Sequence, residues 1–433
     1  MPRPRSFLPA VAVSAAWLAG PPAGALPPPS IESVAVLAER PLPVPGGPAG
    51  GFRLGGISDL AAAGSGADVA LWGITDRGPN GSVTEPARDG AAPRVRRTLP
   101  LPGFAPLLVR FAPAAPGTGG ALEVAETIAL SAPDGDPASG RPTLVDPRAK
   151  PIVDPVSLEP VAIDPDGFDT EGLAALADGR FWIAEEYVPS LAEVGADGRL
   201  RRRIVPAGVV LEGASCPVED SLPADFVQRR ENRGFEALAV APDGTRLYAF
   251  LQSPLADPPP AADAPAEPSI GVPLVVVDPV SGRTLAEHLY PLGDPDSDAC
   301  RWCIAAADGK VSAIAAAGPR ALLVLEQSDT ESRLYRVEVP ERSAPGRTPL
   351  GKTLVADLAP LAAAFQADVV PGSTAAPARL SELKFEGMTL LGPDRVALVN
   401  DNDFDIAADG GGPAVPAARR SCLWILRLPA PLP

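Results

Sequence analysis

Histidine is nearly absent from this sequence, with His288 as the single copy among 433 residues. His288 lies in LAEHLYPL, which is typical of an outer strand, so a Ser-His-Asp triad is not expected. The chain also lacks a G-x-S-x-G elbow between a strand and a helix, a G-x-x-x-x-G-K-[ST] loop and a dinucleotide-binding fingerprint. A hydrolase with this sequence must therefore use a metal-activated water or a carboxylate base.

Basic residues are also scarce. The chain has 37 Lys and Arg against 53 Asp and Glu, which gives a net charge of −16. Nucleic-acid binding and electrostatic attachment to anionic lipid both need clustered Lys and Arg, so neither role is expected. Cations are the better-matched partners. A polyanionic substrate would need a metal ion or a local basic cluster as intermediary.

Long hydrophobic runs are missing apart from one at the N-terminus. There, Arg3 and Arg5 precede the apolar segment FLPAVAVSAAWLAG, and Ala23–Ala25 offers a small-residue cleavage site. This layout predicts a signal peptide over residues 1–25, with an uncleaved anchor as the alternative. No later stretch predicts a membrane span. We therefore expect a periplasmic or secreted bacterial protein, with a single mature domain over 26–433.

Cysteine is limited to four copies: Cys216, Cys300, Cys303 and Cys422. An exported chain meets an oxidising compartment, so we expect two structural disulfides, and three pairings are open. Cys300 and Cys303 form a C-x-x-C, which is also found in zinc and redox sites. A zinc site would need a second pair of cysteines or nearby histidines.

A short pattern occurs five times: ISDL (57–60), TEGL (170–173), FEAL (235–238), VSAI (311–314) and FEGM (385–388). A loop, usually with Gly and Pro or Asp, follows each copy and leads to a second apolar run with a polar end. The offsets from the Glu or Ser of the pattern to that end are 18, 15, 16, 15 and 15 residues. Each unit therefore reads as two strands joined by a tight turn.

Further strands follow in most units, and four-stranded units of this size predict an all-β, five-bladed β-propeller. The last unit offers only CLWILRL as its third strand. The segment ESVAVLAERPL (32–42) would supply the fourth strand and close the ring. Residues 131–168 are either a loop or a sixth blade, and 358–368 predict a short helix. A β-sandwich or a pair of barrels is the alternative fold.

Equivalent positions of the inner strands converge on the axis of a propeller. Glu171, Glu236 and Glu386 should therefore form one ring with Ser58 and Ser312. The polar residues that end the second strands form another set: Asp76, Glu186, Gln252, Gln327 and Asp401. Converging carboxylates hold a cation, bind basic partners or stay protonated.

Oxygen ligands of this kind suit Ca²⁺, and Mg²⁺ less well. The predicted metal ligands are Glu171, Glu236, Glu386, Asn400 and Asp401. The alternative is a hydrated channel lining without an ion.

The few basic residues near this ring are Arg77, Arg233 and Lys384. They either pair with the carboxylates or hold an anionic group of a substrate. The predicted catalytic residues are Asp76 or Glu186 as base, and Arg77 or Lys384 as stabiliser of developing negative charge.

Four blocks, in order, resemble the phytase-like domain described as having esterase-like activity: GGISDL…WGITDRGPNG, DTEGLAAL…FWIAEEYVPSL, NRGFEALAVAPDGTRLYAFLQSPL and KFEGMTLL…VALVNDND. The resemblance covers residues 50–428. It implies an exported bacterial propeller that hydrolyses small phosphate or carboxylic esters, and it assigns no catalytic residue. The ring of carboxylates adds the expectation that a metal-bound water attacks the ester. The alternative function is a non-catalytic periplasmic propeller that binds a ligand or an unknown protein partner.

Overall fold

A computed structural model describes ten stretches of the chain: residues 26–42, 52–64, 69–85, 94–112, 120–144, 151–256, 271–293, 309–343, 347–406 and 418–432. The predicted signal peptide, Cys300 and Cys303 lie outside these stretches. Cys216 and Cys422 are buried, free thiols. No helix in the ten stretches is both long and apolar enough to cross a membrane.

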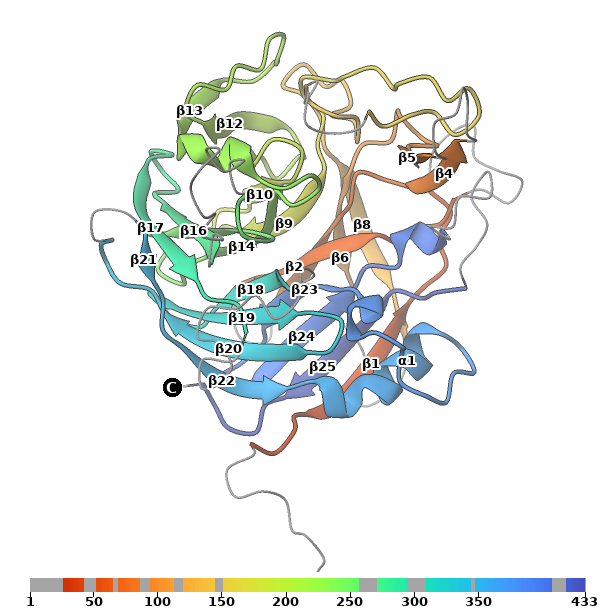
Figure 1. Ribbon diagram of the computed structural model, residues 1–433, viewed down its shortest axis with the longest axis vertical. Helices are drawn as coiled ribbons and strands as arrows, with labels where there is room; N and C mark the ends of the chain where they lie inside the picture. Colours follow the sequence, from red (N-terminus) through yellow and green to blue (C-terminus); the bar gives the residue numbers. More distant parts are fainter. Residues whose placement is uncertain are drawn as a thin grey trace, which may run out of the picture.

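Five antiparallel sheets of four strands surround a common centre and form a five-bladed β-propeller (Figure 1). The inner strands are β2 (Ile57–Ala63), β9 (Thr170–Ala175), β14 (Phe235–Val240), β18 (Lys310–Ala316) and β23 (Phe385–Leu390). Each inner strand packs against the next one, and β23 packs against β2, so the ring is closed. The predicted all-β fold and number of blades are confirmed.

The outer strands of each blade follow the inner strand by simple antiparallel pairing. The second strands are β3 (Ala70–Thr75), β10 (Phe181–Glu185), β15 (Leu247–Leu251), β19 (Ala321–Gln327) and β24 (Arg395–Asn400). The third strands are β6 (Leu107–Phe111), β11 (Ser190–Val194), β16 (Val272–Val277), β20 (Ser332–Glu338) and β25 (Cys422–Arg427). The fourth strands are β8 (Val124–Ala129), β12 (Leu200–Pro206), β17 (Thr284–Tyr290), β22 (Lys352–Asp357) and β1 (Ser30–Leu37).

The second strands are rich in apolar residues because both of their faces are buried. All residues of β15 (LYAFL) and β19 (ALLVLEQ) are buried, because both faces of each strand pack against other elements. The predicted turns are also present: Gly179 and Gly244 adopt φ values of 87° and 69°. Glycine suits this left-handed conformation because it has no Cβ.

The N-terminal strand closes the ring as predicted. β1 pairs antiparallel with β25, with Val36 opposite Cys422. Three short strands, β7 (Gly120–Leu122), β13 (Val218–Leu222) and β21 (Thr348–Pro349), add to the outer edges in parallel, which the sequence did not predict. They cover edges that would otherwise expose unpaired backbone groups.

Two insertions lie outside the blade pattern. A hairpin of β4 (Gly81–Glu85) and β5 (Arg94–Thr98) leaves the first blade between β3 and β6. The described parts of 131–168 form turns and isolated bridges with no four-stranded sheet, so they are not a sixth blade. The helix predicted near 358–368 is α1 (Ala362–Val369), and its Phe365 packs against Phe385 at 4.9 Å between ring centroids.

Candidate functional site

Each inner strand carries a β-bulge at the residue that the sequence placed on the channel. Thr170 and Gly172 of β9 pair with the consecutive residues Glu185 and Ala184 of β10, so Glu171 is the extra residue. The corresponding register shifts in the other four blades leave out Ser58, Glu236, Ser312 and Glu386. A bulge bends the strand and changes the direction of the extra side chain. The same irregularity therefore places all five ring residues.

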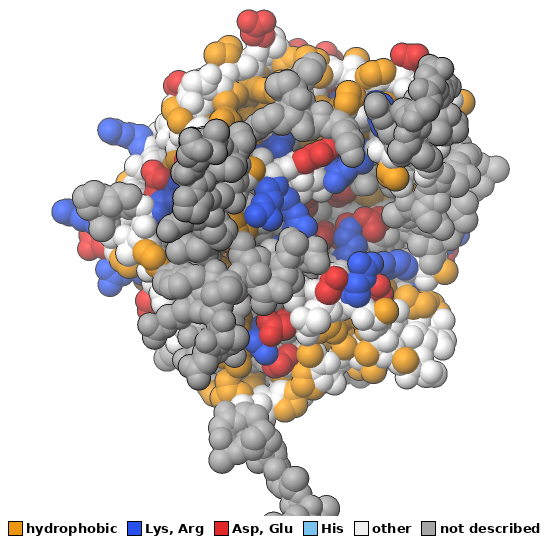
Figure 2. All heavy atoms as spheres, in the orientation of Figure 1, with side chains coloured by type: hydrophobic (Ala, Val, Ile, Leu, Met, Phe, Trp, Pro, Cys, Tyr) orange, Lys and Arg blue, Asp and Glu red, His pale blue; other side chains and the backbone are white. Residues whose placement is uncertain are grey.

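A cavity of about 260 Å³ lies at the centre of the ring. Side chains of both charges gather in the hollow near the middle of the face shown in Figure 2. Eight of the nine predicted site residues line the cavity: Asp76, Arg77, Glu171, Glu186, Glu236, Lys384, Glu386 and Asp401. Acidic residues far apart in the sequence thus meet in one place.

One recurring hydrogen bond holds the second set of predicted residues beside the inner strands. The backbone N–H groups of Asp76, Glu186, Gln252 and Asp401 donate to the carbonyls of Gly56, Asp169, Gly234 and Lys384, at distances from 2.7 to 2.9 Å. Each acceptor lies two residues before the bulge residue of its blade. The equal offsets in the sequence reflect this shared backbone geometry.

Asn400 is the predicted ligand that does not line the cavity. Its Oδ1 accepts a hydrogen bond from the Cys422 N–H at 2.7 Å, and its Nδ2 donates to the Arg420 carbonyl at 3.0 Å. Asn400 therefore connects β24 to the segment that enters β25. Asp401, the next residue, faces the cavity and accepts a hydrogen bond from Lys384 Nζ at 2.7 Å.

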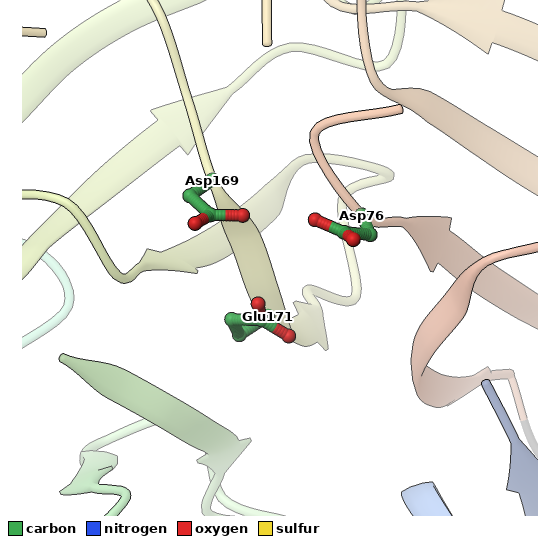
Figure 3. A group of neighbouring side chains, drawn as sticks. All are labelled: Asp76, Asp169 and Glu171. Atoms are coloured by element: carbon green, nitrogen blue, oxygen red, sulfur yellow. The ribbon is translucent and has the colours of Figure 1, made fainter. Parts of the chain in front are cut away.

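Two groups of three carboxylates lie close enough to hold a cation. Oxygens of Glu171, Glu186 and Glu236 lie within 4.8 Å of one another, and so do oxygens of Asp76, Asp169 and Glu171. Figure 3 shows the second group, in which the three carboxylates approach one another from β9 and the end of β3. Glu171 belongs to both groups and is the centre of the acidic cluster.

Two carboxylate oxygens in this cluster are buried and have no hydrogen-bond partner among the described residues: Oε2 of Glu236 and Oδ1 of Asp169. Their residues are only 2% and 0% exposed. A buried carboxylate oxygen without a donor is costly, because it has lost its water and gained nothing in return. A bound cation would remove this cost.

Burial strongly affects protonation in the cluster. It raises the pKa of Asp169 and of Glu186 to about 7, against ordinary values of 3.8 and 4.5. Burial, followed by repulsion from Glu236, raises the pKa of Glu171 well above its ordinary value. Burial does the same to the pKa of Asp76. Near neutral pH, protons therefore compete with a cation for Asp169 and Glu186.

Two of the three basic residues predicted near the ring, Arg77 and Lys384, line the cavity and have carboxylate partners. Arg77 forms an ion pair with Asp169 through Nη1, and Lys384 contacts both Asp401 and Asp403. Pairing of Arg233 with Glu236 and of Lys384 with Glu386 was one reading of the sequence, and the structure differs from it. Both glutamates instead contact Lys310 Nζ, at 3.4 and 3.2 Å.

Arg97 is a further cation at the cavity, supplied by β5. Its Nη1 donates to Oδ1 of Asn232, and the described residues provide no carboxylate in ion-pair contact with it. Burial, followed by repulsion from Arg77, lowers the pKa of Arg97. An anionic group bound here would therefore meet a guanidinium that forms no salt bridge with a described residue, although Glu186, Asp169 and Glu231 lie near enough to act on it electrostatically.

Sequence reasoning missed Asp169, Lys310, Arg97, Asn80 and Asn232. A signal existed for the first two, because the position two residues before each bulge holds Gly56, Asp169, Gly234, Lys310 and Lys384. Three of these five are charged, although the position lies just before the strand or, for Lys310, at its first residue. Arg97, Asn80 and Asn232 lie outside the repeat, so no spacing rule could identify them.

A family model described as "Phytase-like: Esterase-like activity of phytase" matches residues 53–404. The chain is 33% identical over 101 residues to an "Uncharacterized secreted protein" of Arthroderma benhamiae, a match that covers 20% of either chain. The chain thus spans about a fifth of the length of this relative.

Two solved structures resemble the chain more remotely. A PQQ-bound aldose sugar dehydrogenase from Streptomyces coelicolor is 12% identical, with a TM-score of 0.37, and the match covers 93% of this chain and 100% of the dehydrogenase. A gluconolactonase from Xanthomonas campestris is also 12% identical, with a TM-score of 0.30, covering 87% and 98%. The propeller fold is established by the sheet topology itself.

Proposed function

The chain belongs to the phytase-like family, whose description is the esterase-like activity of phytase, and from this premise we propose that it hydrolyses carboxylic or phosphate esters with a bound divalent cation. The convergence of Glu171, Glu186 and Glu236 within 4.8 Å carries the proposal. Glu186 takes the ligand position that the sequence assigned to Glu386, because Glu386 belongs to neither group of three carboxylates among the described residues.

The chemistry of the donors fits a cation. The residues that line the cavity include seven carboxylates and three basic side chains, so negative charge is in excess. The Oε2 of Glu236, which has no hydrogen-bond partner among the described residues, adds an oxygen that can bind the cation. Oxygen-only donors from irregular positions suit Ca²⁺ better than Mg²⁺, which demands near-octahedral geometry. When bound, such a cation polarises an ester oxygen and lowers the pKa of water.

Asp76 is the proposed general base. Burial raises the pKa of Asp76 above its ordinary value, which makes the carboxylate a stronger base than an exposed aspartate. Asn80 Nδ2 donates to Oδ2 of Asp76 at 2.9 Å and orients it. The backbone N–H of Arg77 donates to the other oxygen. Asp76 is thus positioned to accept the proton of the attacking water.

Arg97 is the proposed stabiliser of the negative charge that develops on the substrate. The sequence suggested Arg77 or Lys384 for this role, but both form ion pairs within the cavity. Arg97 forms no salt bridge with a described residue, and a guanidinium outside a salt bridge stabilises a new anion more effectively than one already held in such a pair. Arg97 also lies beside Glu186 on the cavity wall, close to the proposed cation.

We further propose that the protein is exported and cleaved after Ala25. The basic start and apolar run of residues 1–25 support this, as does the name of the secreted fungal relative. N-terminal sequencing of the mature protein from the producing cell checks the cleavage site.

Calorimetry with Ca²⁺ and Mg²⁺, together with assays on carboxylic and phosphate esters, tests the proposal. Glu236→Gln should lose cation binding and hydrolysis, whereas the matched Glu212→Gln, at an exposed position, should retain both. Full turnover in excess EDTA would rule out the cation. Tight cation binding with no hydrolysis across the panel would favour the non-catalytic binding role.

A further inference from the structure

A second cavity, of about 320 Å³, lies beside the acidic one. Seven of its thirteen lining residues are proline, leucine, isoleucine or valine, among them Ile152, Val161 and Ile163. Ile163 is 44% exposed, which is high for an isoleucine at a cavity wall. These side chains offer no hydrogen bonds, so the cavity suits an apolar group.

The two cavities are adjacent and share part of their walls. Arg97, Glu186 and Asn232 line both of them. The shared wall carries Arg97, the proposed stabiliser of negative charge on the substrate, and Glu186, a proposed ligand of the metal ion. A molecule whose ester bond lies at the boundary would place one part in the acidic cavity and the other in the apolar cavity.

The apolar wall is fixed to the strand that carries Arg97. The N–H of Val153 donates to the Arg97 carbonyl at 2.9 Å, and the N–H of Leu99 donates to the Val153 carbonyl at 3.1 Å. Val161 then donates back to the Ile152 carbonyl at 3.0 Å. Residues 151–163 and the β4–β5 hairpin are therefore hydrogen-bonded to each other at the rim of the propeller (Figure 1).

A second anchor holds the other part of the apolar wall, which Pro142 and Leu144 supply. The hydroxyl of Tyr187, which lines the apolar cavity, donates to the Gly140 carbonyl at 2.9 Å. Gly140 approaches the chain so closely that an added Cβ would lie 1.7 Å from the Arg77 carbonyl oxygen. The wall is thus tied at both ends to residues of the acidic site.

We propose that the apolar cavity binds the acyl or alkyl chain of an ester, so that the substrate is amphiphilic. This inference rests on the proposed hydrolase function and names its substrate class. A multiply phosphorylated polyol would leave charged groups against proline and aliphatic side chains, which is unfavourable. An aliphatic chain instead buries its surface there, while its ester group lies between Arg97 and Glu186.

The first test is the chain-length dependence of turnover on p-nitrophenyl acetate, butyrate, hexanoate and octanoate. The value of kcat/KM should rise by about fourfold for each methylene that becomes buried. Ile163→Asp should flatten this dependence. The matched control is Val156→Asp, because Val156 lies in the same segment, is 83% exposed and does not line the cavity. The control should keep the dependence of the parent protein.

The second test measures binding without turnover. Octanoate should bind more tightly than acetate by calorimetry, and Ile163→Asp should remove the difference. If no ester is hydrolysed but this difference is present, the hydrolase proposal fails and the apolar subsite remains. If all esters are hydrolysed equally, or if Ile163→Asp behaves as Val156→Asp does in both tests, the subsite is refuted. Absence of both chain-length effects also refutes it.

Discussion

Glu171 shows why an acidic residue occupies the start of a buried strand. It is the extra residue of a bulge and belongs to both carboxylate groups in the central cavity. Its neighbours in β9 pair normally and bury their side chains. A glutamate in regular strand geometry here would face the neighbouring blade, where an unpaired charge is expensive. Because of the bulge, β9 keeps its regular pairing with β10 on either side of Glu171, while the Glu171 carboxylate joins the acidic cluster.

Substitution of Glu186 and of Glu386 distinguishes the ligand set found in the structure from the one expected from the sequence. Glu186→Gln should weaken Ca²⁺ binding by at least about tenfold, because Glu186 shares the three-carboxylate group with Glu171 and Glu236. Glu386→Gln should have a smaller effect, since Glu386 belongs to neither group of three carboxylates among the described residues. Calorimetric titration of both variants measures the difference. The opposite ranking would restore the ligand set expected from the sequence.

The raised pKa values in the cavity predict the pH dependence of stability without a cation. Asp169 and Glu186 have pKa values of about 7 in the folded protein, against 3.8 and 4.5 ordinarily. The folded protein thus binds more protons than the unfolded chain between about pH 4 and 7, so stability falls as pH rises through this window. In EDTA, the unfolding temperature should be lower at pH 8 than at pH 5.5.

The comparison with Glu186→Gln isolates this effect. The variant lacks one of the two carboxyl groups whose pKa is raised, so its unfolding temperature should fall less between pH 5.5 and 8. Burial lowers the pKa of His288, which acts in the opposite direction, but this contribution is present in both proteins and cancels. Equal slopes for the parent and the variant would contradict the assigned protonation of Glu186.

At the scale of single elements, the close packing of inner strands depends on small residues beside the bulges. A Cβ added at Gly172 would lie 2.7 Å from Leu238 Cβ and 2.9 Å from Ala184 Cβ. Gly172→Ala should therefore destabilise the protein by about 1–3 kcal/mol through overpacking. Chemical denaturation measures this. The control is Gly103→Ala, where nothing lies within 4 Å of the added atom, and it should be nearly neutral.

The sequence predicted the elements well wherever they repeat. Glu171, Glu236 and Glu386 could be placed together because equal offsets in the chain imply equivalent positions in the blades. The bulge was not predictable, since a strand with one extra residue has no distinct spacing. Arg97 could not be predicted either, because the β4–β5 hairpin has no counterpart among the described residues of the other blades.

The insertions around the site could not be placed from the sequence for the same reason, since they lie outside the repeat. Residues 131–168 have no repeat and are rich in proline and aspartate, so their sequence left a loop and a sixth blade equally open. Their position is determined by long-range contacts, such as the bond from Tyr187 to Gly140. Asn400 illustrates the converse, because a correctly placed repeat residue turned out to bond to the backbone at Cys422. Spacing predicts the location of a residue and leaves its partners open.

At the scale of the whole molecule, the propeller is closed by a single strand from the other end of the chain. β1 completes the fifth blade by pairing with β25, so residues about four hundred positions apart become neighbours. Val36 and Cys422 face each other there and belong to the same hydrophobic cluster. The adjacent pair is hydrogen-bonded, with Leu37 N–H donating to the Ser421 carbonyl at 2.9 Å. Val36 and Cys422 are thus a non-hydrogen-bonded pair, whose side chains lie closest together.

This geometry predicts that Val36→Cys forms a disulfide with Cys422 and locks the ring. Because burial raises the pKa of the Cys422 thiol to about 12, the bridge should form during refolding in a glutathione buffer, before the thiol is buried. A bridge across so long a loop should stabilise the protein by about 2–4 kcal/mol, reversibly on reduction. Mass spectrometry and thermal unfolding with and without reductant measure both effects. Val34→Cys, which faces Trp424, should form no such bridge. A Val36→Cys protein that refolds with Cys422 unbridged and has the stability of the parent would show that this register does not hold the closing strand.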